Sequence, residues 1–367
     1  MEESPKRTGP IYLRPEAEGC TLHIHSIVLL TMAFSADPTA QPYVVEDCRG
    51  VLQLLSDGTV VRSAALPFPV DGNVAYNDHG RVEWKDAVYD AGLGLGLRMY
   101  KPTTNAREEG KKLPVLVYFH GGGFCIGSCT WPNFHAGCLR LAAELPAVVL
   151  SFDYRLAPEH RLPAAHEDAA AALLWLQNQL ASDPWLADAA NPRKVFVSGE
   201  SAGGNIAHHL ALRFGRAGLD PMRIEGYILL MPAFCSEQPT QSELDSPPTA
   251  FLTRETFDRY CRLFLPAGAN KDHPLVNPFG PESPSLETLD VGRVLVVAAE
   301  GDLLRDKNVE YAERLRAARG KENDGIELVV FTGEEHAFFG VKPMSAATGE
   351  LVRVIRRFMA TETEAAC

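Results

Sequence analysis

The sequence contains no long run of basic residues. Its lysines and arginines form nothing longer than pairs such as Lys6-Arg7 and Lys111-Lys112, and the 367-residue chain has a formal net charge of -12 at pH 7. Proteins that bind nucleic acid neutralise many phosphates with clustered cations. We therefore expect no nucleic-acid partner.

Cysteine is also scarce. The eight cysteines are scattered and none forms a C-x-x-C pair, which excludes a zinc ribbon and a thioredoxin-type redox motif. The histidine pairs His23-x-His25 and His208-His209 have no further ligands at metal spacing. We expect reduced thiols, no metal and no cofactor.

A long apolar segment is missing as well. The segment 21–34 is apolar, but it contains His23 and His25 and is too short to span a bilayer. It follows Glu16 and Glu18, whereas a signal peptide has a basic leader. We expect no membrane partner and a cytoplasmic protein, with the nucleus left open as a second location.

The N-terminal part differs in composition from the rest of the chain. Residues 1–42 are rich in polar residues, proline and glycine around one apolar patch, which predicts a poorly structured extension. Met32 is an alternative start, so the sequence leaves open whether residues 1–31 belong to the mature protein. Residues 43–367 have enough apolar side chains for one large domain.

Strand-length and helix-length apolar segments alternate along this domain. A meander over 82–89 and 93–101 comes first. The further predicted strands are 113–119, 147–152, 195–198, 224–231, 294–299 and 326–331, and the predicted helices are 133–145, 164–180, 202–214, 306–319 and 346–358. This alternation predicts a parallel sheet with helices on both faces and ligands at the carboxyl ends of the strands.

Residues 233–290 interrupt the alternation. They are rich in proline, serine and acidic residues around one predicted helix, 254–264. Because the insertion follows a strand at its carboxyl end, we expect it to form a lid over the site together with residues 43–75. In the segment 46–55 the apolar spacing fits a helix and a strand equally well, so neither is predicted there.

A nucleophile motif lies between a predicted strand and a predicted helix. It reads Gly199-Glu200-Ser201-Ala202-Gly203. A serine on such a sharp turn exposes its oxygen above the sheet, and larger side chains at the two glycines would collide with neighbouring backbone. A bare G-x-S-x-G pattern is a weak signal, and the strand-turn-helix context strengthens it. Ser201 is our candidate nucleophile.

A second motif supplies the partner that this nucleophile needs. The strand 113–119 ends in His120-Gly121-Gly122-Gly123. An oxyanion formed by attack on a carbonyl needs backbone N–H groups that it can approach closely, and glycines allow this. We predict oxyanion donors at Gly121, Gly122 and Gly123 with the amide of Ala202, and a role for His120 in holding the loop.

The serine also requires a base and an acid that orients it. In hydrolases with this sheet the chain order is serine, acid, histidine. His336 follows the last strand in a loop that can reach Ser201, and Asp302 follows the strand before it. These two complete the predicted triad. Glu300 and Asp306 are alternative acids, with Asp306 the better candidate for a helix cap.

The remaining candidates are weaker. His208 and His209 lie on the helix after the nucleophile, and we expect structural roles for both, while His273 lies in the predicted lid. We expect Glu200 to support the loop. Aromatic residues flank the motifs and are predicted to line an apolar pocket: Phe124, Trp131 and Phe338.

These motifs together resemble the hormone-sensitive-lipase-like branch of the α/β-hydrolase family, and within it the plant carboxylesterases. The resemblance covers residue 43 to the end and rests on His120-Gly-Gly-Gly-Phe, Tyr154-Arg-Leu-Ala-Pro-Glu-His160, Gly199-Glu-Ser-Ala-Gly-Gly204, His273-Pro-Leu-Val-Asn-Pro278 and Gly301-Asp-Leu-Leu-Arg-Asp306. It implies an α/β-hydrolase fold, with a mostly parallel eight-stranded sheet, helices on both faces and a helical lid.

The resemblance also implies an activity. Most of the group are carboxylesterases, so we expect hydrolysis of short-acyl or small aromatic esters. The same plant group includes gibberellin receptors, which lack the catalytic histidine, and hydroxyisoflavanone dehydratases, which use the site for elimination. His336 is present here, which argues against a pure receptor, but the motifs do not exclude a dehydratase. Nothing in the sequence indicates the oligomeric state.

Overall fold

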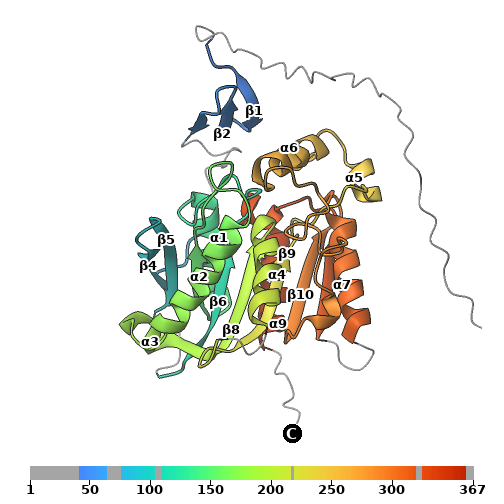
Figure 1. The fold of residues 1–367 in the computed structure, drawn as a ribbon. Coiled ribbons are helices and arrows are strands. Elements are labelled where there is room, and N and C mark those ends of the chain that lie inside the picture. The colour runs from blue at the N-terminus through green and yellow to red at the C-terminus, as the bar shows by residue number, and fades with distance from the viewer. Residues whose placement is uncertain (1–40, 64–75, 104–109, 216–218, 320–324, 361–367) are drawn as a thin grey trace, which may run out of the picture. The chain divides into compact units, whose positions relative to one another are not determined.

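An eight-stranded sheet forms the centre of the molecule (Figure 1). The structure is a computed structural model that describes residues 41–63, 76–103, 110–215, 219–319 and 325–360, and residues from Pro42 onward form one compact unit. The strands are β4 (Val82–Asp90), β5 (Leu95–Pro102), β6 (Leu113–Phe119), β7 (Val148–Phe152), β8 (Ala190–Glu200), β9 (Ile224–Leu230), β10 (Arg293–Ala299) and β11 (Ile326–Phe331).

The strand order is β11-β10-β9-β8-β6-β7-β5-β4. Neighbouring strands from β11 to β7 are parallel, and β5 is antiparallel to both β7 and β4. The mostly parallel eight-stranded sheet predicted from the sequence is confirmed. Because β6, β8, β10 and β11 are parallel, their carboxyl ends meet at one edge, where the loops with the predicted site residues begin.

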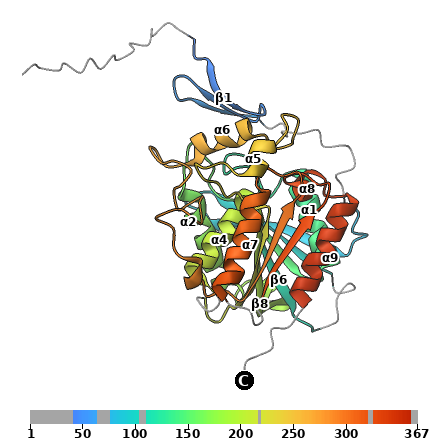
Figure 2. The ribbon, with the colours of Figure 1, turned by 90° about the vertical axis from the view of Figure 1, so that its right-hand side faces the viewer.

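Helices cover both faces of this sheet, as Figure 2 shows. One core contains α2 (Ala164–Gln179), α3 (Pro184–Ala189), α4 (Ala202–Phe214) and α7 (Arg305–Arg319). The opposite core contains α1 (Pro132–Glu144), α8 (Phe338–Val341) and α9 (Ala346–Ala360). The central strands bury side chains on both faces, which explains their continuous apolar sequence. The short helices α3 and α8 were not predicted.

The lid consists of a small sheet and short helices. Its N-terminal part is an antiparallel sheet of β1 (Val44–Cys48), β2 (Leu52–Leu55) and β3 (Val60–Arg62). The insertion after β9 contains α5 (Gln241–Asp245), α6 (Arg254–Phe264) and a 3-10 turn, η2 (Leu286–Thr288). The insertion is helical, whereas the N-terminal part of the predicted lid is a sheet, and the segment 46–55, for which neither element was predicted, forms strands with a turn between them. Residues 1–40 and 64–75 lie outside the described residues, so the predicted extension stays a prediction.

Three histidines lie together between α2 and α4, of which His166 and His208 are buried and His209 is partly buried. His166 donates from Nε2 to Asn205 Oδ1 at 2.8 Å, His209 donates from Nε2 to the Leu275 carbonyl at 3.0 Å, and the rings of His166 and His209 are 4.0 Å apart. His208 is hydrogen-bonded to the Tyr311 hydroxyl at 3.0 Å. These contacts agree with the structural roles expected for His208 and His209.

We expect this cluster to make the fold sensitive to acid. Burial lowers the pKa of all three histidines, that of His209 to about 4. Unfolded histidine has a pKa near 6.5, so the unfolded chain binds more protons below that value. The stabilisation is complete above about pH 6.5 and is lost as the pH falls toward the lower folded-state pKa, by about 3 kcal/mol for His209 alone.

Urea unfolding at about pH 7.5 and about pH 5 tests this prediction. The wild type should lose free energy of unfolding between the two conditions, and His209→Gln should lose less of it. His79→Gln provides a control, because His79 is exposed. Equal pH dependence in the wild type and His209→Gln would contradict the prediction.

Candidate active site

Ser201 occupies a strained position between β8 and α4. Its backbone has φ 57° and ψ -113°, in a region that L-residues rarely adopt. A Cβ on Gly199 would lie 2.2 Å from the Gly203 carbonyl oxygen, and one on Gly203 would lie 2.0 Å from that of Phe119. Both glycines of the motif are therefore required by close backbone packing, as the sequence pattern predicted.

The structure brings Ser201, His336 and Asp302 together. His336 Nε2 lies 2.8 Å from Ser201 Oγ, and His336 Nδ1 lies 2.7 Å from Asp302 Oδ2. The carboxylate accepts the Nδ1 proton, which leaves Nε2 free to accept the proton of the serine hydroxyl. Asp302 is fixed in turn by a hydrogen bond from the Leu304 amide at 2.9 Å. All three side chains are buried.

The alternative acids bind elsewhere. Glu300 accepts from the Gly333 amide at 2.8 Å, and Asp306 accepts from the Ser242 amide, also at 2.8 Å. Asp306 lies inside the first turn of α7, so its predicted role as a helix cap is wrong. Its actual contact holds α5 of the lid against α7.

The environment of His336 prepares it to act as a base. Burial by itself lowers the pKa of His336, but the charge of Asp302 and the hydrogen bond to it raise the pKa, and the net pKa lies above the ordinary value of 6.5. The imidazolium that forms when His336 accepts a proton is therefore stabilised by the carboxylate. This arrangement suits proton transfer from the serine hydroxyl.

The glycine loop after β6 lies against the nucleophile. Gly122 has φ 118°, and a Cβ there would lie 1.9 Å from the Ile126 carbonyl oxygen, so the loop requires glycine at this position. Among the described residues, the amides of Gly122, Gly123 and Ala202 have no backbone acceptor. These N–H groups remain available to an oxyanion, as does the amino end of α4. The oxyanion roles, that of Gly121 included, stay predictions.

His120 holds this loop from behind. Its Nδ1 donates to the Gly121 carbonyl at 2.7 Å, and its ring stacks on Tyr154 with centroids 4.5 Å apart. The Tyr154 hydroxyl donates to the His120 carbonyl at 2.8 Å. Burial lowers the pKa of His120, so the ring is neutral. The predicted holding role fits these contacts.

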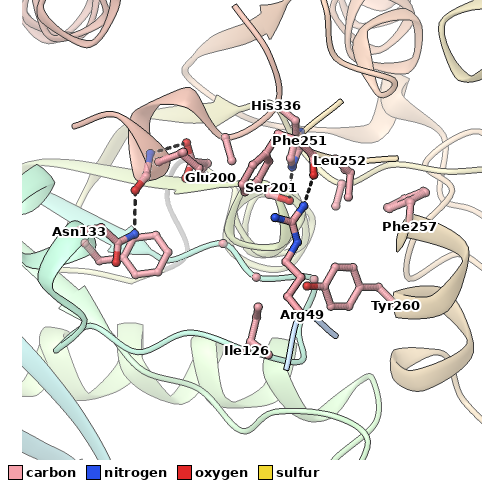
Figure 3. A pocket seen from close by; sticks show the side chains of 18 of the residues that line it. Arg49, Ile126, Asn133, Glu200, Ser201, Phe251, Leu252, Phe257, Tyr260 and His336 are labelled. Carbon is pink, nitrogen blue, oxygen red and sulfur yellow. Dashed lines mark hydrogen bonds between the residues drawn. The ribbon is translucent and has the colours of Figure 1, made fainter. Parts of the chain in front are cut away.

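Glu200 supports a different loop from the one expected. Its Oε1 accepts from the Gly340 amide at 3.1 Å, and the Gly340 carbonyl accepts from Asn133 Nδ2 at 2.7 Å. Burial raises the pKa of Glu200 to about 7. Figure 3 shows these two bonds side by side. Glu200 thus fixes α8, which begins two residues after His336, and through it the position of the His336 side chain.

An apolar pocket opens beside Ser201 and His336 (Figure 3). Its empty volume is about 670 Å³, which includes the part open to solvent. The larger side chains that line the pocket come from the segment after the glycine loop, α1 and the residue before it, the lid and α8: Arg49, Ile126, Trp131, Asn133, Phe134, Phe251, Leu252, Phe257, Tyr260 and Val341.

The predicted pocket residues are correct only in part. Trp131 lines the pocket. Phe124 and Phe338 do not: both are 1% exposed, Phe124 packs on Phe264 and His166, and Phe338 packs on Phe331. Their assignment to the pocket is corrected, because both rings pack against buried aromatic residues of the core.

Sequence reasoning missed most of the pocket wall. Phe251, Leu252, Phe257 and Tyr260 belong to the insertion that was recognised as a lid, but its spacing gave no indication of which side faces Ser201. Arg49 lies in the segment 46–55 for which no element was predicted. Its position could have been predicted only if the two strands of this segment, with Arg49 at the turn between them, had been recognised.

No group of three or more histidine, cysteine or acidic side chains is arranged to hold a metal ion within the described residues. In the same part of the chain, no helix combines the length and the apolar character needed to cross a bilayer.

Comparisons with known proteins agree with this architecture. A family model described as alpha/beta hydrolase fold matches residues 116–340. A relative from Arabidopsis thaliana named "Probable carboxylesterase 6" is 39% identical over 80% of this chain and 84% of its own. A 2-hydroxyisoflavanone dehydratase from Glycyrrhiza echinata is 33% identical over 89% of this chain and all of its own.

A receptor and an archaeal esterase are also similar to this chain. A gibberellin receptor from Arabidopsis thaliana is 35% identical over 68% of this chain and 72% of its own. A hyperthermophilic esterase from the archaeon Pyrobaculum calidifontis superposes with a TM-score of 0.62 and 30% identity over 76% of this chain and 83% of that chain. The chain belongs to the α/β-hydrolase family. Within it, the chain belongs to the plant carboxylesterase group of the hormone-sensitive-lipase-like branch, as its motifs predicted.

Proposed function

We propose that this chain hydrolyses carboxylic esters through a covalent acyl-enzyme. The single observation that carries the proposal is the continuous hydrogen-bonded chain from Ser201 through His336 to Asp302. Its carboxylesterase relatives and esterase structural neighbours support the same class, a carboxylic-ester hydrolase.

The geometry supports a two-step mechanism. Ser201 Oγ attacks the ester carbonyl while His336 Nε2 takes its proton, and Asp302 stabilises the resulting imidazolium. The oxyanion binds the amides of the glycine loop and Ala202. When the tetrahedral intermediate collapses, the C–O bond breaks and His336 gives its proton to the leaving alcohol. Water then attacks the acyl-serine with His336 again as base, which releases the acid and restores the free serine.

The pocket supports small, apolar substrates. Its aromatic and aliphatic walls favour short acyl groups or small aromatic esters over charged polymers. A receptor without catalysis is disfavoured because the three triad side chains are in hydrogen-bond contact. Elimination of water remains the second candidate, since a dehydratase matches 89% of this chain over the whole of its own length.

Labelling with a fluorophosphonate tests the proposal most directly. The probe phosphonylates an activated serine, so mass spectrometry should find the adduct on Ser201 and on no other serine. The labelled protein should hydrolyse none of a series of 4-nitrophenyl esters that the unlabelled protein cleaves. An unlabelled Ser201, or an adduct that leaves hydrolysis intact, would overturn the mechanism. A hydroxyisoflavanone dehydrated faster than any ester is cleaved would favour elimination.

The pH dependence should follow His336. Only neutral His336 accepts the serine proton, so we expect kcat/KM to fall with unit slope as the pH drops below a pKa that is higher than 6.5. Glu200, whose own pKa is about 7, contributes to raising that pKa while it is ionised. Glu200→Gln should therefore shift the acid limb to lower pH. Profiles of an aryl ester between about pH 5 and pH 9 measure both effects; the same midpoint in both proteins would contradict the second.

A further inference from the structure

A cationic side chain, that of Arg49, enters the largely apolar pocket from the lid. Arg49 lies at the turn between β1 and β2, where the Val51 amide donates to the Cys48 carbonyl at 3.1 Å. Arg49 has φ 57° and Gly50 has φ 68°. A left-handed backbone is uncommon for a residue other than glycine, and such positions often occur at functional sites.

The turn that presents Arg49 is held rigidly. The carboxylate of Asp47 accepts from the Gly50 amide at 2.6 Å and from Gln53 Nε2 at 2.7 Å. The next acid, Glu46, forms ion pairs with Arg259 and Arg262 of α6 at 3.2 and 2.6 Å. The acids nearest in sequence are therefore engaged elsewhere, and the small sheet is attached to α6.

The guanidinium of Arg49 points into the pocket. It donates to the Phe251 carbonyl and lies 4.3 Å from the centre of the Phe251 ring, as Figure 3 shows beside Ser201 and Tyr260. Within the described part of the chain, no carboxylate is within ion-pair distance of Arg49. The same Phe251 donates its amide to Glu335 Oε2 at 3.1 Å, so this acid is already hydrogen-bonded.

The charge of Arg49 also acts on the catalytic base. It opposes the effect of Asp302 and lowers the pKa of His336. The cation is thus close enough to the reacting atoms to influence a charge there. The acid in the lining, Glu200, is buried and bonded to α8, so it does not neutralise Arg49.

On this basis we propose that Arg49 is a specificity-determining residue that selects esters carrying an anionic group, a carboxylate above all, apart from the ester bond. The proposal rests on the proposed ester hydrolysis and names its substrate class. A guanidinium binds a carboxylate through two parallel hydrogen bonds, and Phe251 holds its plane in place. The apolar walls would hold the rest of the substrate.

Matched pairs of esters test the proposal. One pair places the charge on the leaving group, 4-acetoxybenzoate against 4-acetoxybenzamide. The other places it on the acyl group, phenyl hydrogen adipate against phenyl methyl adipate. The readout is the ratio of kcat/KM between the anionic and the neutral member, because this ratio cancels differences in folding and in active fraction.

In at least one pair, Arg49→Met should lower this ratio by about tenfold or more, as expected for a lost charge-assisted hydrogen bond. Arg49→Lys should retain part of the preference, and added salt should reduce it. Arg254→Gln is the matched control: Arg254 is on the lid helix α6 and does not line the pocket, so the ratio should stay unchanged.

The outcomes separate the two proposals. Hydrolysis of the neutral esters with equal ratios in the wild type and Arg49→Met would overturn the role of Arg49 alone. Failure of every ester to be hydrolysed, together with absence of fluorophosphonate labelling at Ser201, would overturn the proposed function and this inference with it. A ratio that falls equally in Arg254→Gln would show a general charge effect and overturn the role of Arg49.

Discussion

Ser201→Ala is expected to lower kcat for an aryl ester by about a million-fold, the scale seen when the nucleophile of a serine hydrolase is removed. Without Oγ no acyl-enzyme can form, and His336 has no hydroxyl from which to take a proton. A residual rate above the uncatalysed reaction should persist, because the glycine loop and the amide of Ala202 still stabilise an oxyanion formed by water. Steady-state kinetics with a spectrophotometric ester gives the decrease.

The fold should tolerate this substitution, so the loss can be assigned to chemistry. Alanine retains the Cβ, and the backbone bonds at the turn do not use the side chain: the Ser201 amide donates to the Leu230 carbonyl, and the Ser201 carbonyl accepts from Asn205 and Ala233. Ser198→Ala is the matched control, because Ser198 is buried three residues earlier in β8. Activity above about one hundredth of the wild type in Ser201→Ala would contradict a nucleophilic role.

The same variant discriminates between hydrolysis and elimination. Elimination of water requires a base to remove a proton, but it does not require a serine that becomes acylated. A variant that loses ester turnover and keeps most of a dehydratase activity would show that His336 works without Ser201. Loss of both activities would instead assign Ser201 a role in orienting either substrate.

The sheet and the triad could be predicted because their sequence signals are local. Buried parallel strands are continuous apolar runs in the sequence. The turn at Ser201 requires glycine at positions 199 and 203, and this pattern is recognisable in the sequence. Parallel strands then bring the loops after β10 and β11 to the same edge as Ser201, so the proximity of Asp302 and His336 to Ser201 was predicted from chain order and from their positions after these strands. Topology made this part of the site predictable.

The pocket wall was not predictable in the same way. Whether Phe124 points into the core or the pocket depends on its packing against Phe264 of the lid helix, a contact made 140 residues later in the chain. Arg49 reaches the site only because a three-stranded sheet attaches to α6 through Glu46. Such long-range contacts leave no periodicity in the sequence. The cytoplasmic location likewise stays a prediction.

Asp302→Asn is expected to lower kcat by about ten-thousand-fold, although it only replaces one carboxylate oxygen by an amide NH2 group. An asparagine at this position can donate its NH2 group to His336 Nδ1. The imidazole would then carry its proton on Nε2, where it can no longer accept from Ser201. The distance of 2.7 Å between Asp302 and His336 makes this tautomer exchange the direct consequence of the substitution.

The substitution should also leave a signature in the pH profile that a merely structural defect would not. The charge of Asp302 and its hydrogen bond raise the pKa of His336 against the effect of burial. In Asp302→Asn burial and Arg49 still lower that pKa and only the smaller effect of Glu200 raises it, so the acid limb of residual activity should move to lower pH. Glu300→Gln is the matched control, since Glu300 follows the same strand but accepts from Gly333. A large kcat loss with an unmoved acid limb would mean that Asp302 holds the loop without acting on the base.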